Sequence, residues 1–196
     1  MTHGDAGGED AASKVGGVTV DCSAAGSSVT IRLATFEDAD SVVTVLRRSI
    51  AELCVADHYN DPDVLGAWLA NKTVANAQAW IQCPRNFMVI ADAGAAASSP
   101  GGISAADPAS AVGVCGVASM SITGTVLLCY VLPEVQSSGV GRALLASLEA
   151  EARRRGLREV SLESTVSARG FYFRHGYLPR SNDPPDSPLL CKVVLP

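Results

Sequence analysis

The sequence predicts one α+β domain in which helices cover the faces of a central β-sheet. Short stretches such as 125–132 are continuously apolar, as a central strand is, and longer stretches such as 39–53 repeat apolar residues every three or four positions, as a helix does. A chain of 196 residues is long enough for one substantial core and short for two. We therefore expect a single domain of mixed elements.

The first 28 residues differ in composition from the rest of the chain. They are rich in Gly, Ala, Ser and acidic residues and contain one short apolar run, at 18–22. Such a composition buries too little surface to offset the entropy lost when the chain is ordered. We predict a flexible N-terminal tail over 1–28, interrupted at most by a short strand at 18–22, and a folded domain over 29–196.

Three helices are signalled in the first half of the domain by residues suited to cap them. An N-cap side chain accepts a hydrogen bond from the first turn of its helix, and each of these residues precedes an apolar helical pattern. The three caps are Thr35, which forms a capping box with Asp38, then Asp61, which is followed by Pro62, and Thr73. The helix over 39–53 is the longest of the three.

β-strands are predicted where short alternating or apolar runs stand between turn residues. These runs are 29–33, 87–91, 111–120, 125–132, 158–163 and 188–194. Between the second and third strands, residues 93–110 are almost entirely Ala, Ser, Gly and Pro, which leaves that segment without an apolar anchor. We predict a flexible insertion over 93–110.

Charge and hydropathy exclude two classes of partner. The net charge of −5 and the pI near 5.1 leave no surplus of Lys and Arg for a nucleic-acid phosphate backbone. The longest apolar runs are far shorter than the roughly 18 to 20 residues that span a bilayer. The N-terminus shows no secretory signal pattern, and the six cysteines lack the spacing of a zinc site. We expect a cytoplasmic protein with no membrane, nucleic-acid or metal partner.

The stretch after the strand over 125–132 carries the strongest functional signal. A Ser- and Gly-rich loop leads into a helix whose apolar face is formed by residues spaced three and four apart, up to Gly156. Free backbone N–H groups at such a helix start can bind phosphate, and glycine lets the phosphate approach the amides. A P-loop is excluded because no Lys occurs between Lys72 and Lys192. A dinucleotide fingerprint fits badly because Leu144 stands where Gly or Ala is needed. An ordinary helix start with no ligand is the remaining alternative.

The spacing Gln136-x-x-Gly139-x-Gly141 resembles the acyl-CoA pyrophosphate motif of the GNAT superfamily, Q/R-x-x-G-x-G/A. The resemblance implies an α+β, three-layer GNAT fold, with a central, twisted, mixed and mostly antiparallel sheet flanked by helices. It also implies acetyl-CoA as co-substrate. The residues that it assigns to CoA are Val131 and Leu132, for the pantetheine arm, and Gln136, Ser137, Ser138, Gly139, Val140, Gly141 and Arg142, for the pyrophosphate.

A second segment, residues 167–177, looks like the family's N-A-x-x-F-Y-x-x-x-G-F/Y motif. Phe171, Tyr172, Gly176 and Tyr177 match, while Ser167 replaces the usual Asn and is expected to cap a helix. The resemblance spans residues 29–180 and assigns Tyr172 as the acid that protonates the departing thiolate. A core tyrosine is the structural alternative for this position.

Transfer of an acetyl group to an amine also needs a base, because an alkyl ammonium of pKa about 10.4 is almost fully protonated at pH 7. His58 lies in the loop that borders the acceptor site in this family, and its side-chain type suits a base. It can equally be a solvated loop histidine. Glu163 and Glu134 are the carboxylates that could act through water. No Cys or Ser stands in a nucleophile motif, so we expect direct transfer in a ternary complex.

Two functions remain open from the sequence. The first is N-acetyl transfer to a primary amine, which could be a polyamine, an amino acid, an aminoglycoside-like compound or a protein amine. The second is an acyl-CoA-binding sensor or interaction module without turnover. A homodimer, common in the superfamily, is also possible.

Overall fold

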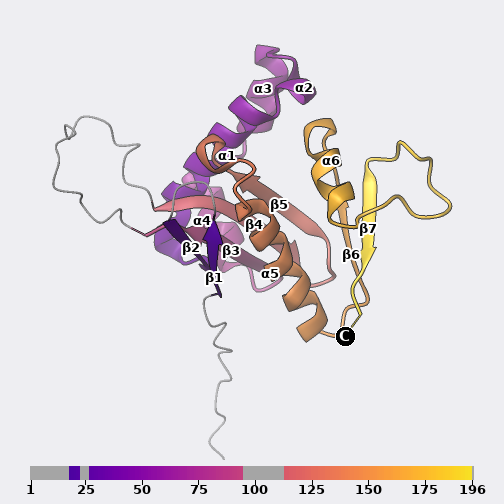
Figure 1. The fold of residues 1–196 in the computed structure, drawn as a ribbon. Helices are drawn as coiled ribbons and strands as arrows, with labels where there is room; N and C mark the ends of the chain where they lie inside the picture. The colour runs from indigo at the N-terminus through magenta and orange to yellow at the C-terminus, as the bar shows by residue number, and fades with distance from the viewer. Residues whose placement is uncertain (1–17, 23–26, 95–112, 196) are drawn as a thin grey trace, which may run out of the picture.

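Five strands form an antiparallel sheet in the order β1-β2-β3-β4-β5 in the computed structural model (Figure 1), which describes residues 18–22, 27–94 and 113–195. The strands are β1 (Val18–Cys22), β2 (Ser27–Leu33), β3 (Asn86–Asp92), β4 (Val114–Ser121) and β5 (Val126–Val131). Each of the last four matches a stretch predicted as a strand. The central strands β3 and β4 are buried along almost their whole length, as their continuous apolar sequences require.

The short strand predicted at 18–22 is confirmed as β1, which pairs with β2 at the edge of the sheet. Part of the predicted tail therefore belongs to the sheet. Residues 1–17 and 23–26 lie outside the described residues, as do residues 95–112 of the predicted insertion. At the boundary of that insertion, the Ala93 amide donates to the Gly113 carbonyl at 2.9 Å, which extends the β3–β4 ladder.

Helices begin where the predicted caps stand. Thr35 and Asp38 form the capping box, which starts the short helix η1 (Phe36–Asp38) and then α1 (Ala39–Leu53). Asp61 accepts from two amides of α3 (Pro62–Leu69), and Thr73 accepts from α4 (Val74–Gln82). The loop predicted around residue 58 instead contains a short helix, α2 (Val55–His58).

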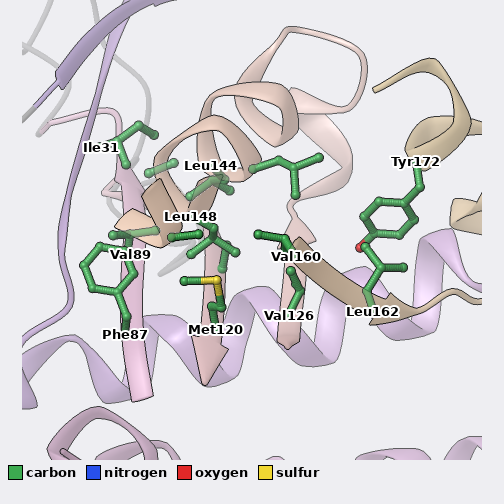
Figure 2. Packing of buried hydrophobic residues seen from close by; sticks show 14 of the residues in the cluster. Ile31, Phe87, Val89, Met120, Val126, Leu144, Leu148, Val160, Leu162 and Tyr172 are labelled. Atoms are coloured by element: carbon green, nitrogen blue, oxygen red, sulfur yellow. The ribbon is translucent and has the colours of Figure 1, made fainter. Parts of the chain in front are cut away.

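The two faces of the sheet are covered by different helices, which gives three layers. Helices α1 and α4 pack on one face, and α5 (Val140–Arg154) packs on the other, across strands β1 to β5. Figure 2 shows the core beneath α5, where Leu144 and Leu148 meet Val89, Met120 and Val126. Gly116 of β4 allows this contact, because an added Cβ would lie 2.9 Å from Leu144 Cδ1.

A second, two-stranded sheet stands beside the first. It consists of β6 (Glu159–Glu163) and β7 (Leu189–Val193), with α6 (Val166–Arg174) between them in sequence. The two sheets touch through one parallel bridge, Thr125↔Ser161. Beyond that bridge β5 and β6 separate, so that the backbone edge of β5 is left without a neighbouring strand.

Candidate functional site

The separation of β5 from β6 opens a cleft of ≈ 610 Å³. One wall is β5, and the other is formed by the end of β6 together with α6. The last turn of α1 lines the cleft at one end, through Ser49, Leu53 and Cys54, and the loop 135–142 lines it at the other. The cleft thus brings together the two segments that resemble family motifs, one in the loop that leads into α5 and the other in α6.

The loop before α5 presents backbone amides to the cleft. Ser137 and Gly139 both have positive φ, at +64° and +99°, which turns the chain sharply into the helix. Gly139 is the N-cap residue and supplies no side-chain cap, and the first amides of a helix have no partner within it. Gly139, Gly141 and Arg142 line the cleft. This end of the cleft is therefore rich in hydrogen-bond donors.

Glycine at 141 also fits the loop against α6. A Cβ at this position would lie 3.4 Å from the Phe171 ring, so the helices α5 and α6 approach closely here. Three basic side chains line the same cleft: Arg142, Arg174 and His175. Open amides at a helix N-terminus together with cations form a favourable site for an anionic group such as pyrophosphate. The residues present fit the phosphate end of CoA.

The free edge of β5 faces the cleft with alternate backbone groups. The Leu132 amide donates to Cys115 of β4 at 2.8 Å, and its carbonyl accepts from Val135. Both backbone groups of Leu132 are thus engaged, so it does not offer them to pantetheine as the resemblance implied. Along an antiparallel strand, the backbone N–H and C=O groups of successive residues point to opposite edges. Leu132 points to β4, so the N–H and C=O groups of Val131 and Cys129 point to the other edge of β5, toward the cleft. We missed Cys129, although the two-residue period of the strand relates it to Val131.

Tyr172 points from α6 toward Leu162 of β6 (Figure 2) and lines the cleft. Its side chain is 7% exposed, and burial raises its pKa well above the ordinary value. The Cys129 thiol interacts with it across the cleft, and burial raises the pKa of that thiol to about 11. A phenol in these surroundings stays protonated over the whole neutral range, which is the state an acid needs.

His58 lies away from the cleft, in disagreement with its predicted place beside the acceptor. It is fully buried, its Nε2 lies 3.1 Å from the Ile50 carbonyl, and its Nδ1 accepts from the Asn60 amide at 3.1 Å. Since Nδ1 accepts, Nε2 must carry the proton and donate to Ile50. Both ring nitrogens are engaged within the protein and neither can accept a proton from an amine, so His58 is not the base that we predicted.

The two carboxylates that the sequence offered in place of His58 have different surroundings. Glu163, at the end of β6, lines the cleft. Glu134 pairs with Arg48 at 2.7 Å on the surface, and that hydrogen bond lowers its pKa below the usual value. Glu163 is therefore better placed than Glu134 to take a proton from a molecule in the cleft.

The N-terminus of α6 differs from the predicted one. Thr165, not Ser167, is the N-cap residue, and it accepts from the Ala168 amide. Ser167 lies in the first turn, and its amide donates to Asp57 of α2. Asp57 thus joins the site, although nothing in the local sequence around residue 57 indicates a partner more than one hundred residues away.

Within the described ranges no helix is long and apolar enough to cross a membrane. The same residues contain no group of three or more His, Cys, Asp or Glu side chains that could hold a metal ion.

Residues 101–179 match the family model described as acetyltransferase (GNAT) domain. A search of curated proteins found no match for the sequence. Similar solved structures include a GCN5-related N-acetyltransferase from Rhodopseudomonas palustris, at 20% identity and a TM-score of 0.63, which covers 83% of this chain and 94% of the other. The PaiA N-acetyltransferase of Thermoplasma acidophilum, in complex with coenzyme A, has 18% identity and a TM-score of 0.64, and the match covers 84% of this chain and 98% of that chain.

A GNAT family acetyltransferase from Brucella melitensis, in complex with acetyl-CoA, has 17% identity and a TM-score of 0.55, with 86% of this chain and 89% of that chain covered. At these identities the likeness establishes the fold. The predicted GNAT fold is confirmed, and the family match supports acetyltransferase activity in general.

Proposed function

We propose that this chain, which matches the model of an acetyltransferase (GNAT) domain over residues 101–179, transfers the acetyl group of acetyl-CoA directly to a primary amine within a ternary complex. The observation that carries this proposal is the cleft between β5 and β6. It joins a phosphate-binding loop, a free strand edge and a buried tyrosine in one continuous space. An acyl-CoA bound there would lie with its phosphates at the start of α5 and its thioester beside β5.

The loop from Gln136 to Arg142 would hold the pyrophosphate through its amides and through the charge of Arg142. Val131 and Cys129 would bind the pantetheine arm and the thioester carbonyl through the backbone groups on the free edge of β5. A backbone N–H placed at that carbonyl stabilises the oxyanion that forms when the amine attacks.

The amine must lose a proton before it attacks. At pH 7, removing the proton from an alkyl ammonium costs about 4.6 kcal/mol of free energy, because its pKa is about 10.4. We assign Glu163 as the group that removes this proton, directly or through water. The neutral amine then adds to the thioester carbon and forms a C–N bond.

Collapse of the tetrahedral intermediate breaks the C–S bond and releases the thiolate of CoA. Tyr172 would donate its hydroxyl proton to this sulfur. The Cys129 thiol interacts with this hydroxyl across the cleft, so the surroundings of Tyr172 already include a sulfur atom. The nitrogen of the intermediate loses its second proton as the neutral amide forms, and the phenolate of Tyr172 regains a proton from this nitrogen or from solvent.

The test measures thiol release from acetyl-CoA in the presence of primary amines, for wild type and Tyr172→Phe, with CoA binding followed by calorimetry. We expect the variant to bind CoA like wild type and to lose about 10² to 10⁴ in kcat, the usual contribution of a positioned acid. Tyr59→Phe serves as the matched control, because Tyr59 is 80% exposed. Binding of CoA without turnover of any amine would instead favour an acyl-CoA sensor.

A further inference from the structure

Hydrogen bonds connect α2 to the first turn of α6 at the end of the cleft that Cys54 and Thr165 line. Asp57 of α2 accepts hydrogen bonds from the backbone amides of Val166, at 2.6 Å, and Ser167, at 3.2 Å. These amides belong to the first turn of α6, where they have no partner within the helix. Helix α2 follows α1, which lies on the β5 side of the cleft, while α6 follows β6 on the other side. Figure 1 shows α2 beside the end of α6.

The segment that carries Asp57 is built to hold this position. His58 is buried in full and fixes the turn from both ring nitrogens, to Ile50 and to Asn60. Tyr59 and Asn60 both adopt positive φ, at +52° and +57°, which reverses the chain directly after α2. Non-glycine residues seldom adopt this conformation, so the surrounding contacts must maintain it. The buried histidine therefore acts as the anchor of the connection.

The half of the cleft beneath this connection is almost uncharged. Its lining includes Leu53, Cys54, Leu128, Tyr130 and Leu162. The basic lining residues belong to the phosphate end, described above. Among the described residues that line the cleft, Glu163 is the one carboxylate. A polyamine or aminoglycoside needs several carboxylates to offset its charges once water is displaced, and this half of the cleft does not supply them.

We propose that the acceptor is a small monoamine with an apolar body, and that Asp57 is a specificity-determining residue because it closes the cleft between α2 and α6 to bulkier acceptors. This inference rests on the proposed acetyl transfer. A protein segment would have to lie across the cleft at the place where Asp57 joins the two walls. A small amine can enter beneath the connection, place its apolar part against Leu128 and Tyr130, and direct its amino group toward Glu163.

The experiment compares kcat/KM for three acceptors: 2-phenylethylamine, spermidine and a lysine-containing dodecapeptide. For wild type we expect kcat/KM for 2-phenylethylamine to exceed kcat/KM for each of the other two acceptors by roughly tenfold or more, a ratio that contacts in a pocket can produce. Asp57→Ala should raise the ratio of kcat/KM for the peptide to kcat/KM for 2-phenylethylamine by about tenfold. Asp57→Asn, which keeps one acceptor oxygen, should give an intermediate ratio. Asp63→Ala, an exposed acidic residue of the same region, should leave the ratio at the wild-type value.

Hydrogen exchange supplies a readout that does not depend on activity. The amides of Val166 and Ser167 should exchange faster in Asp57→Ala than in Asp63→Ala, while CoA affinity and the circular dichroism spectrum stay as in wild type. A preference of wild type for spermidine or the peptide, or an unchanged ratio and exchange rate in Asp57→Ala, would overturn this inference while leaving acetyl transfer intact. Binding of CoA with no turnover of any acceptor would overturn the proposed function as well.

Discussion

The thiol of Cys129 on β5 and the hydroxyl of Tyr172 on α6 interact across the cleft that both residues line. The two residues are 43 positions apart in sequence and lie on opposite walls. A sulfur atom of the protein thus lies in the surroundings of the proposed acid.

Cys129 should react slowly with iodoacetamide at pH 8. Burial raises the pKa of its thiol to about 11, so the reactive thiolate is roughly a hundredfold rarer than for an ordinary thiol. Because the thiolate fraction grows tenfold per pH unit below the pKa, the initial rate should rise between pH 8 and pH 10. Peptide mass spectrometry measures it, with Cys129→Ser to identify the peptide. Acetyl-CoA should protect the thiol, and rapid alkylation at pH 8 would contradict this account.

Glu163→Gln should lower kcat for amine acetylation by about 10², because the amide cannot accept the proton. Glu134→Gln is the matched control, since Glu134 pairs with Arg48 outside the cleft. Stopped assays of thiol release give both values, with CoA affinity measured in parallel. If Glu163→Gln kept its activity and Glu134→Gln lost it, Glu134 and not Glu163 would be the residue that removes the proton.

Gly116→Ala should destabilise the fold and weaken CoA binding together. The added Cβ would lie 2.9 Å from Leu144 Cδ1 and 3.1 Å from Val140 Cγ1, so these buried side chains, which belong to the start of α5, must shift. We expect a loss of about 1–3 kcal/mol in the free energy of unfolding. Gly66→Ala in α3 is the control, because its Cβ would meet nothing within 4 Å and alanine favours a helix. Equal stability of the two variants in urea would argue against this packing.

Lys192→Met should destabilise the protein because it leaves a buried carboxylate without its closest cation. Glu149 is 6% exposed, and its Oε1 accepts hydrogen bonds from the Lys192 ammonium at 2.8 Å and from the Tyr177 hydroxyl at 3.2 Å. Arg153, at 3.6 Å, offsets part of the loss, so we expect about 3 kcal/mol, the low end for such a deletion. Urea unfolding measures it. Glu52→Gln, which disturbs an exposed ion pair, should change stability by less than about 1 kcal/mol.

Local signals in the sequence predicted most elements and the chemistry of one end of the cleft. The caps at Thr35, Asp61 and Thr73 stand at the predicted helix starts, because a cap depends on groups within three residues of itself. The glycine spacing of the loop before α5 is equally local, since the positive φ at Gly139 and the amides of the first turn belong to one short segment.

The sequence failed where a residue's role depends on distant partners. His58 reads as a polar loop residue, yet the fold buries it and engages both ring nitrogens. Leu132 lies next to Val131, but strand pairing turns its backbone away from the cleft.

By itself, then, the sequence determined where most helices and strands begin and the turn that leads into α5, because these depend on neighbouring residues along the chain. Only the tertiary structure decided that Cys129 faces Tyr172 and that Asp57 closes the cleft against α6. Both pairs join segments far apart in sequence, and it is the separation of β5 from β6 that brings them across one space.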